Sequence, residues 1–298
     1  MDSTDLAFFA AVVEEGGVTA AARRLNCVQS NVTARIRALE AELGVALFHR
    51  NGRGVQPTRA AEVLLPYARQ VAATLAEARL AVRDLLDPGV VQGPLVIGCM
   101  ETTAAMRLPA ILAAYHRDFP QVELALETGP TEFLLTALSN FSLDAALVAG
   151  PVEDPALEAE LLGVEEMVIA AAAAGPAWPD LLSRPGLAAL SFRRGCAYRE
   201  RLLGLLSFLN ARHVRIQEFG TLEGIIGGVA AGIGVALLPR MAVEGSRLAH
   251  AVRLYPVPAP WNAVPTVLVR RRGSLVTSAL RHFGEYARIG WQEERAVA

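Results

Sequence analysis

The apolar positions of the first 44 residues recur at the spacing of amphipathic helices. Residues 6–15 and 30–44 each place their apolar side chains on one face, and a shorter helix fits residues 19–25 between them. Gly16 and Gly44 follow the first and third of these segments, where glycine ends a helix at low cost. The apolar positions are Leu6, Phe9, Ala10, Val13, Val32, Ile36, Leu39 and Leu43. This pattern predicts three short helices that pack together.

The opposite face of the third helix has polar side chains of the kinds that bond to base edges and phosphates. They are Gln29, Ser30, Asn31, Thr33 and Arg35. In the next segment Asn51 and Gly52 predict a hairpin turn, which would place Arg50 and Arg53 on a small β-wing. On an isolated helix such a polar face would be ordinary solvated surface. The order of helices, wing and a further long helix favours a winged helix-turn-helix DNA-binding domain over residues 1–57.

A long helix is predicted after the wing, with Thr58 as its N-cap. Its apolar residues recur every seven positions in two rows, which is typical of the a and d positions of a coiled coil. The rows are Ala61, Ala68, Leu75 and Val82, and Leu64, Val71, Ala78 and Leu85. Such a seam needs a partner helix. We therefore expect residues 58–89 to form a dimerisation linker that ends in a hinge at 87–89.

From Gly93 onward the pattern changes to short apolar strands that alternate with helices, which is typical of parallel sheets with βαβ crossovers. Strands are expected at 94–99, 122–128, 143–150, 167–173, 187–192, 214–220, 235–239 and 266–271. Helices are expected at 104–116, 131–139, 197–210, 221–231 and 274–289. The second half of the chain is therefore predicted to be an α/β domain.

Composition narrows the class of protein. The chain has 298 residues, of which 53% are apolar and 19% charged, so it can bury two or three cores and is not disordered. The net charge is -2, but arginines gather between residues 23 and 59, as a phosphate-binding patch requires. No apolar run is long enough for a membrane span, and the N-terminus has acids where a secretory signal has bases. We therefore expect a cytoplasmic protein with no membrane partner.

Residues 1–87 resemble the DNA-binding region of the LysR-type transcriptional regulators. The resemblance rests on AAARRLNCVQSNVTARIRALEAELGVALFHRNGRGVQPT, and extends over the chain through VIGCMETTAAMRLPAILAAYHRDFP, LSFRRGCAYRERL and TLEGIIGGVAAGIGVALLP. One departure is TRAAE after the wing, where the family usually has a glycine; Ala61 suits a helix, so we expect no loss of function. The resemblance implies an effector-binding domain over 90–298, similar to a periplasmic binding protein. Its lobe I would comprise 90–161 and 266–298, and its lobe II 162–265.

Ligands of open α/β sheets bind beyond the carboxyl ends of the strands, where helix N-termini also point. The resemblance puts effector contacts on the same loops. The candidate effector-binding residues are Thr102, Thr103, Thr128, Gly129, Arg193, Arg194, Cys196, Phe219 and Thr221. Their hydroxyls and two arginines favour a small anionic co-inducer, and no cofactor or metal is expected. The alternative is that the arginines form ion pairs between lobes or subunits.

Functions other than transcriptional regulation fit the sequence less well. The histidines lie far apart with no nucleophile motif, so no enzyme is expected. A solute-binding protein would account for residues 90–298, but it would have no use for the winged helix and coiled coil predicted in residues 1–87. Cys99 and Cys196 are expected on facing loops of the cleft, so a thiol-based redox-sensing regulator stays an alternative. The family resemblance implies a homo-oligomer, a tetramer of two dimers, that binds operator DNA, a small-molecule effector and RNA polymerase.

Overall fold

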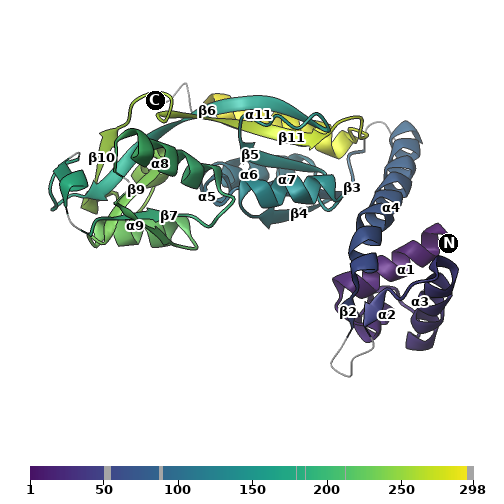
Figure 1. Ribbon diagram of the computed structural model, residues 1–298. Helices are drawn as coiled ribbons and strands as arrows, with labels where there is room; N and C mark the ends of the chain where they lie inside the picture. The colour runs from purple at the N-terminus through teal and green to yellow at the C-terminus, as the bar shows by residue number, and fades with distance from the viewer. Residues whose placement is uncertain (50–54, 87–89, 179, 185, 212, 294–298) are drawn as a thin grey trace. The chain divides into compact units, whose positions relative to one another are not determined.

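The computed structural model describes residues 1–49, 55–86, 90–178, 180–184, 186–211 and 213–293 (Figure 1). The chain divides into two compact units, one built on Met1–Val90 and the other on Val91–Ser139 with Leu143–Ala298. A winged helix-turn-helix with a long linker helix and a two-lobed α/β domain were predicted from the sequence. Both are confirmed.

Three short helices form the body of the first unit: α1 (Ser3–Glu14), α2 (Val18–Arg24) and α3 (Gln29–Leu43). Asp2 caps α1 through a capping box, because its side chain accepts from the Asp5 amide and the Asp5 side chain accepts in return. At the end of α3, Gly44 adopts a φ of 69°, a left-handed conformation that favours glycine. The predicted apolar faces of α1 and α3 meet in a single core.

The wing and the linker helix complete this unit. Strands β1 (Phe48–His49) and β2 (Gln56–Pro57) pair antiparallel, and α4 (Arg59–Leu86) follows directly. The Thr58 hydroxyl donates to the carbonyl of Ala46 at 2.9 Å, which fixes the start of α4 against the segment before β1. The predicted turn residues of the wing, and the hinge at 87–89, lie outside the described residues.

The second unit is organised by one nine-stranded sheet, in the order β4-β3-β5-β11-β6-β9-β7-β8, with β10 paired to β6. Strands β4, β3 and β5 are parallel to one another, as are β8, β7 and β9. Antiparallel β6 and β11 join these two sets, each of which forms one lobe (Figure 1). The strands are β3 (Gly93–Cys99), β4 (Val122–Thr128), β5 (Ala145–Ala149), β6 (Leu157–Ala172), β7 (Ala188–Ser191), β8 (Arg215–Glu218), β9 (Gly234–Pro239), β10 (Val252–Pro256) and β11 (Ala263–Arg271).

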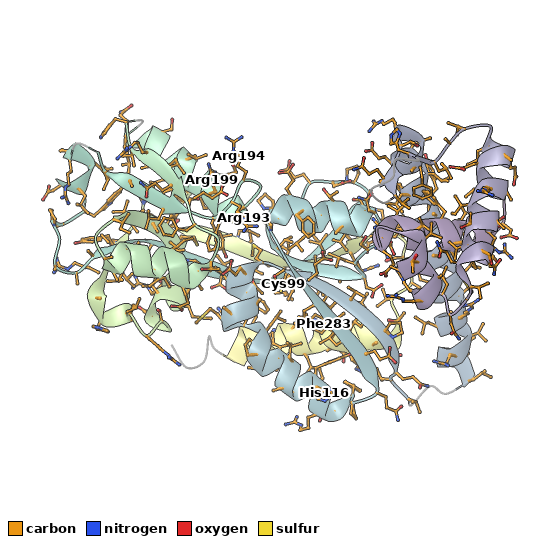
Figure 2. The ribbon with its side chains drawn as sticks, turned by 90° about the horizontal axis from the view of Figure 1, so that it is seen from below. Cys99, His116, Arg193, Arg194, Arg199 and Phe283 are labelled. Atoms are coloured by element: carbon orange, nitrogen blue, oxygen red, sulfur yellow. The ribbon has the colours of Figure 1, made fainter. Side chains whose placement is uncertain are left out.

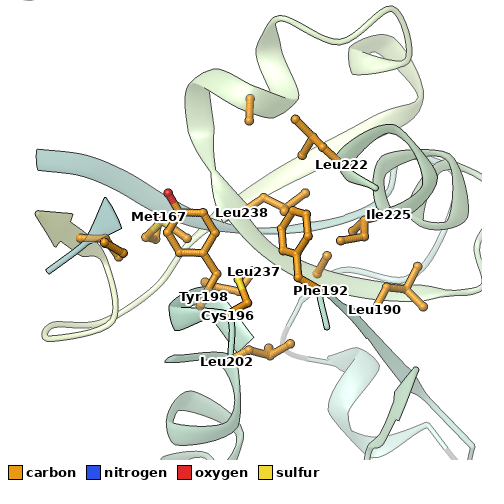
Figure 3. Close-up of a cluster of buried hydrophobic side chains, with 14 of the residues drawn as sticks. Met167, Leu190, Phe192, Cys196, Tyr198, Leu202, Leu222, Ile225, Leu237 and Leu238 are labelled. Carbon is orange, nitrogen blue, oxygen red and sulfur yellow. The ribbon is translucent and has the colours of Figure 1, made fainter. Parts of the chain in front are cut away.

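Helices cover both lobes. They are α5 (Glu101–Met106), α6 (Leu108–Asp118), α7 (Thr131–Ser139), α8 (Ala197–Phe208), α9 (Leu222–Ala230), α10 (Arg240–Glu244) and α11 (Ser278–Glu293), with 3-10 turns at Asp180–Ser183 and Ala249–Ala251. In lobe I the Tyr115 hydroxyl donates to the carbonyl of Ala279 at 2.9 Å and ties α6 to α11. In lobe II, Leu190, Leu222 and Leu238 belong to a buried cluster between β7, β9 and α9 (Figure 3).

The long β6 strand differs from the sequence prediction. A strand was expected only from Met167, where the uninterrupted apolar run begins, yet β6 begins at Leu157. Arginines pair with these acids: Arg270 with Glu158 and Arg288 with Glu160. Because β6 and β11 are continuous through the predicted lobe boundaries at 161/162 and 265/266, the connection between lobes is strand and not loop.

Two smaller differences concern helices and an edge strand. The helix predicted over 104–116 is two helices, α5 and α6, which meet at Arg107. Pro109 lies in the first turn of α6, where its missing amide breaks no helical hydrogen bond. Strand β10 was not predicted, because the alternation of its five residues is too short to be distinctive.

Candidate DNA-binding surface and effector cavity

The start of α3 presents the polar side chains that the sequence singled out for DNA. Gln29, Ser30 and Asn31 are all exposed in its first turn, while Val32 and Ile36 on the other face are buried. The apolar face thus anchors α3 to the core of the first unit and leaves three consecutive polar residues at its N-terminus in solvent. This is the geometry of a helix that enters the major groove by its N-terminal end.

Two other predicted DNA-binding residues have partners within the protein. The Arg35 guanidinium forms an ion pair with Asp5 at 2.8 Å and lies over the ring of Phe8, with 5.1 Å from Cζ to the ring centroid. The Thr33 hydroxyl donates to the carbonyl of Gln29 at 3.0 Å. Arg35 therefore fastens α3 to α1. The predicted wing residues Arg50 and Arg53 lie outside the described residues.

The apolar seam of α4 has two different environments. Its first half packs on the unit's own core, where Ala61 and Ala68 are fully buried. Its second half is open: Val82 is 59% exposed and Leu85 is 82% exposed. The prediction of a coiled-coil seam along the whole helix was therefore wrong for the first two heptads, because α1 already covers them.

The second unit holds a cavity of about 200 Å³ at the carboxyl ends of strands from both lobes. The loops after β3 and β4 form one wall, and those after β7 and β8 form the other. The lining residues are Met100, Glu101, Thr102, Thr128, Gly129, Pro130, Phe192, Arg193, Cys196, Tyr198 and Gly220. Of the candidate effector-binding residues, Thr102, Thr128, Gly129, Arg193 and Cys196 are in this set.

Four of the predicted residues do not line this cavity. Thr103 is buried one position further along α5, beside a small void of about 10 Å³. Arg194 is exposed and projects away from the cavity, unlike Arg193 (Figure 2). Phe219 packs against the core of lobe II, and the Thr221 hydroxyl caps α9 by accepting from the Gly224 amide at 3.1 Å. Residues that are adjacent in the sequence can therefore differ in whether they line the cavity, because their side chains point in different directions.

The sequence did not single out six of the lining residues. Met100 and Pro130 are apolar residues that resemble any core position, and Gly220 has no side chain to suggest a contact. Phe192 and Tyr198 are largely buried in the cluster around Leu237 (Figure 3). Glu101 did have a usable signal, because it begins the helix that follows β3, where the same strand-end rule selected Thr102.

Hydrogen bonds cross between the walls of the cavity. Glu101 of lobe I accepts from the backbone amide of Leu222 in lobe II, with 2.7 Å between Oε1 and N. At a second point the Glu132 amide donates to the carbonyl of Gly195 at 3.2 Å. The Glu101 carboxylate therefore occupies the N-terminal end of α9, which favours a negative group.

The charged groups near the cavity differ in their pairing. Arg193 is exposed, and no ion pair or hydrogen bond of its guanidinium is formed with the part of the chain that the structure describes. Arg199 lies 3.5 Å from Glu218 and donates to the carbonyl of Phe192 at 3.1 Å. The alternative that Arg193 forms an ion pair between the lobes is therefore not realised among the described residues.

Comparisons with known proteins decide the family. A family model described as "LysR substrate binding domain" matches residues 88–292, and one described as "Bacterial regulatory helix-turn-helix protein, lysR family" matches residues 3–62. The chain belongs to the LysR family of transcriptional regulators. It is 43% identical over 283 residues to the HTH-type transcriptional regulator YusT of Bacillus subtilis (strain 168), covering 95% of this chain and 94% of that protein. It is thus a DNA-binding transcriptional regulator with an effector-binding domain, and not an enzyme.

Solved structures of full-length LysR-type proteins share this fold. A full-length OxyR variant from Pseudomonas aeruginosa has a TM-score of 0.73 at 24% identity, covering 98% of this chain and 95% of that one. CbnR in complex with its target DNA has a TM-score of 0.67 at 22% identity, covering 97% and 100%. The order of a helix-turn-helix, a linker helix and two α/β lobes is therefore the architecture of this LysR-family chain.

The cysteines of the LysR-family chain are not placed as predicted. Cys99 is the last residue of β3, fully buried in the core of lobe I, and does not line the cavity. Burial raises the pKa of the Cys99 thiol to about 12. Cys196 does line the cavity, but burial also raises its pKa above the ordinary value. The prediction that the two thiols face each other across the cleft was wrong, since β3 carries Cys99 into the lobe core.

None of the helices in the described residues combines the length and apolar character needed to cross a bilayer. Within the same residues no three His, Cys, Asp or Glu side chains are grouped as metal ligands.

Proposed function

We propose that this LysR-family regulator binds a small anionic effector in the cavity between its two lobes, and that the bound effector alters its binding to operator DNA. The observation that supports this proposal most strongly is Arg193, an exposed guanidinium on the wall of the cavity with no acidic partner among the described residues. A planar guanidinium is well suited to bind a carboxylate or phosphate through two parallel hydrogen bonds.

The opposite wall adds neutral donors for such a group. Thr128 lies at the end of β4, and α7 begins three residues later, at Thr131. Helix N-termini favour negative charge because their first amides lack helical acceptors. An anion between Thr128 and Arg193 would therefore contact both lobes at once.

For the DNA-binding half, we propose that Gln29, Ser30 and Asn31 contact base edges or phosphates of the operator. Their exposure in the first turn of α3 supports this role, as does the fold shared with CbnR, which was crystallised with its target DNA. Arg50 and Arg53 of the wing are proposed to contact the adjacent backbone. Arg35 acts mainly by holding α3 against α1.

The open half of α4 supports self-association. Leu75, Val82 and Leu85 keep a coiled-coil spacing and are exposed, so a second copy of the helix would bury them. We propose a homodimer formed through this surface, with two dimers joined into a tetramer that binds spaced half-sites. A cytoplasmic location and contact with RNA polymerase complete the proposal, in line with the transcriptional role of the family.

Coupling between the two sites needs only a difference in affinity. An effector that binds one arrangement of the lobes more tightly than another shifts the population toward that arrangement. In an oligomer, such a shift would change the spacing of the DNA-binding domains that are linked to the lobes. The continuous strands β6 and β11 are the elements through which one lobe can bend relative to the other.

The effector site is tested by calorimetric titration of the full-length protein with a panel of small carboxylates and phosphates. At least one should bind saturably to the wild type, and Arg193→Ala should weaken it about tenfold or more, since a charged hydrogen bond is lost. Arg194→Ala is the matched control, because this neighbouring arginine does not line the cavity. If no anion binds, or if both variants behave alike, the effector part of the proposal is refuted.

A further inference from the structure

The cavity contains two opposite charges that are not paired with each other. Glu101 stands on the lobe I wall and Arg193 on the lobe II wall, and no ion pair joins them. Both side chains line the same cavity of about 200 Å³, so a ligand bound there can meet both charges.

Glu101 has one oxygen in use and one available. Its Oε1 accepts from the Leu222 amide at 2.7 Å, which fixes the carboxylate at the cavity wall. Among the described residues, Oε2 has no donor. No lysine or arginine side chain of that part of the chain forms an ion pair with Glu101. A cationic group inside the cavity would therefore find a fixed and unshared oxygen.

Arg193 lies beside Gly220, a residue that has no side chain. A Cβ atom on Gly220 would lie 3.5 Å from its Nη2, so the guanidinium rests against the backbone of the loop before α9. Gly220 also lines the cavity. Arg193 and Gly220 therefore border the same cavity, and no described residue accepts a hydrogen bond from this guanidinium.

Neighbouring charges are already satisfied or point elsewhere. Arg199 pairs with Glu218, and Arg107 pairs with Glu165 at 3.1 Å. The Glu132 carboxylate lies against Gly195, since a Cβ there would come within 2.9 Å of Oε2, and it does not line the cavity. Glu101 and Arg193 are thus the two charges that the described walls offer to a ligand.

We propose that the effector is a small zwitterion of the α-amino acid class, with its ammonium group at Glu101 Oε2 and its carboxylate at Arg193. This inference rests on the proposed effector site and narrows its ligand: the anionic group bound by Arg193 is the carboxylate of a zwitterion. A ligand with negative charge alone would bring like charge to Glu101, which is unfavourable, whereas a zwitterion compensates both walls. The cavity volume of about 200 Å³ lies below the roughly 300–1,000 Å³ of drug-sized pockets, which suits a ligand of this size.

The direct test uses the unmodified full-length protein. Each of the standard amino acids is titrated by calorimetry, and every binder is compared with its 2-oxo acid, which lacks the ammonium group, and with its decarboxylated amine. We expect saturable binding of at least one amino acid, with both analogues weaker by about tenfold or more. An oxo acid that binds as tightly as the amino acid, or no binding by any amino acid, overturns the inference.

A variant of Glu101 tests whether this residue binds the ammonium group of the ligand. Glu101→Gln keeps the size and one acceptor oxygen but removes the charge, so it should weaken the amino acid about tenfold and leave the oxo acid unchanged or tighter. Glu200→Gln, on the exposed side of α8, is the matched control and should leave both affinities unchanged. Equal loss of amino acid and oxo acid in Glu101→Gln would contradict a role for its charge.

The outcomes separate this inference from the broader proposal. An oxo acid that binds in an Arg193-dependent manner, with no preference for the amino acid, refutes the zwitterion and leaves the anion site standing. If neither class binds, both proposals are refuted.

Discussion

The DNA-binding surface and the effector cavity are built in opposite ways. Gln29, Ser30 and Asn31 are consecutive in sequence and exposed by one turn of a single helix. The cavity instead draws on segments that follow β3, β4, β7 and β8, and its two facing charges, Glu101 and Arg193, lie far apart in the chain. A site on one helix depends mainly on that helix, whereas a site between lobes depends on everything that positions the lobes.

The arginines of the two regions also differ in how far away in the chain their partners lie. On the DNA-binding unit, Arg35 is held by a local partner on α1, and the base-contacting candidates need no further support. In the effector domain, Arg107 reaches from between α5 and α6 to Glu165 on β6, and lies 5.4 Å from the ring centre of Trp291. The long-range pair therefore positions the wall on which Glu101 stands.

The largest effect is expected from breaking that pair. Glu165→Ala leaves the guanidinium of Arg107 buried without its main partner, and should destabilise the effector domain by about 3–5 kcal/mol. The measurement is urea unfolding of the full-length protein, followed by tryptophan fluorescence. Glu160→Gln, whose partner Arg288 is about half exposed, is the control and should cost less than about 1 kcal/mol. Equal losses in the two variants would contradict the special role of the Arg107 pair.

A second prediction concerns the two halves of α4. Leu75→Asp introduces a charge into the exposed half of the seam and should weaken self-association by about 2–4 kcal/mol, because the partner helix would have to bury it. Its own unit should remain folded. Sedimentation across a range of protein concentrations measures this effect, with Glu77→Gln on the same helix as control. If the variant associates like the wild type, the exposed heptads are not the interface.

On the DNA-binding surface, Asn31→Ala should weaken operator binding by about 1–3 kcal/mol through the loss of a base contact. Its stability should not change, since the side chain is exposed. Arg35→Ala should instead lower stability, because it removes the contacts with Asp5 and Phe8. Gel-shift titration paired with thermal unfolding separates the two. If the Asn31→Ala protein bound the operator with full affinity, Asn31 would not be one of the residues that contact bases.

The smallest effect is expected at the thiols. At pH 7.5 a thiol whose pKa is about 12 holds almost no reactive thiolate, so Cys99 should resist iodoacetamide in the folded protein. Cys196, whose pKa is also raised by burial, should react slowly, and half-exposed Cys27 should react first. Mass spectrometry of the labelled peptides over time gives the order. Labelling of Cys99 as fast as Cys27 would revive the thiol-sensor alternative.

Much of the fold was predictable because its signals are local. The helical faces around Phe9 and Ile36, the cap at Thr58 and the glycine at position 44 each act within one turn of chain. Eight of the nine strands in the two lobes were found from their apolar runs, whereas β10 was missed. Strand β6 was cut short because the sequence does not show that distant arginines pair with Glu158 and Glu160.

The cavity was less predictable because the contacts that form it are not local in the sequence. The strand-end rule found the loops that hold Thr102, Thr128 and Arg193. It could not tell Arg193 from Arg194, because which side of a turn a side chain takes depends on packing that is absent from the sequence. The rule also reaches Glu101, which begins the helix after β3, but it does not give the role of this residue, which depends on the Leu222 amide of the other lobe.

The central claim is that ligand binding between the lobes alters DNA binding by α3. The most direct measurement is a footprint of the full-length protein on the DNA upstream of its own gene, with scrambled competitor, in the presence and absence of the amino acid that binds most tightly. The account predicts protection that survives the competitor and changes in extent on ligand addition for the wild type, but not for Arg193→Ala. Protection that the competitor abolishes, or that the ligand leaves unchanged, would contradict it.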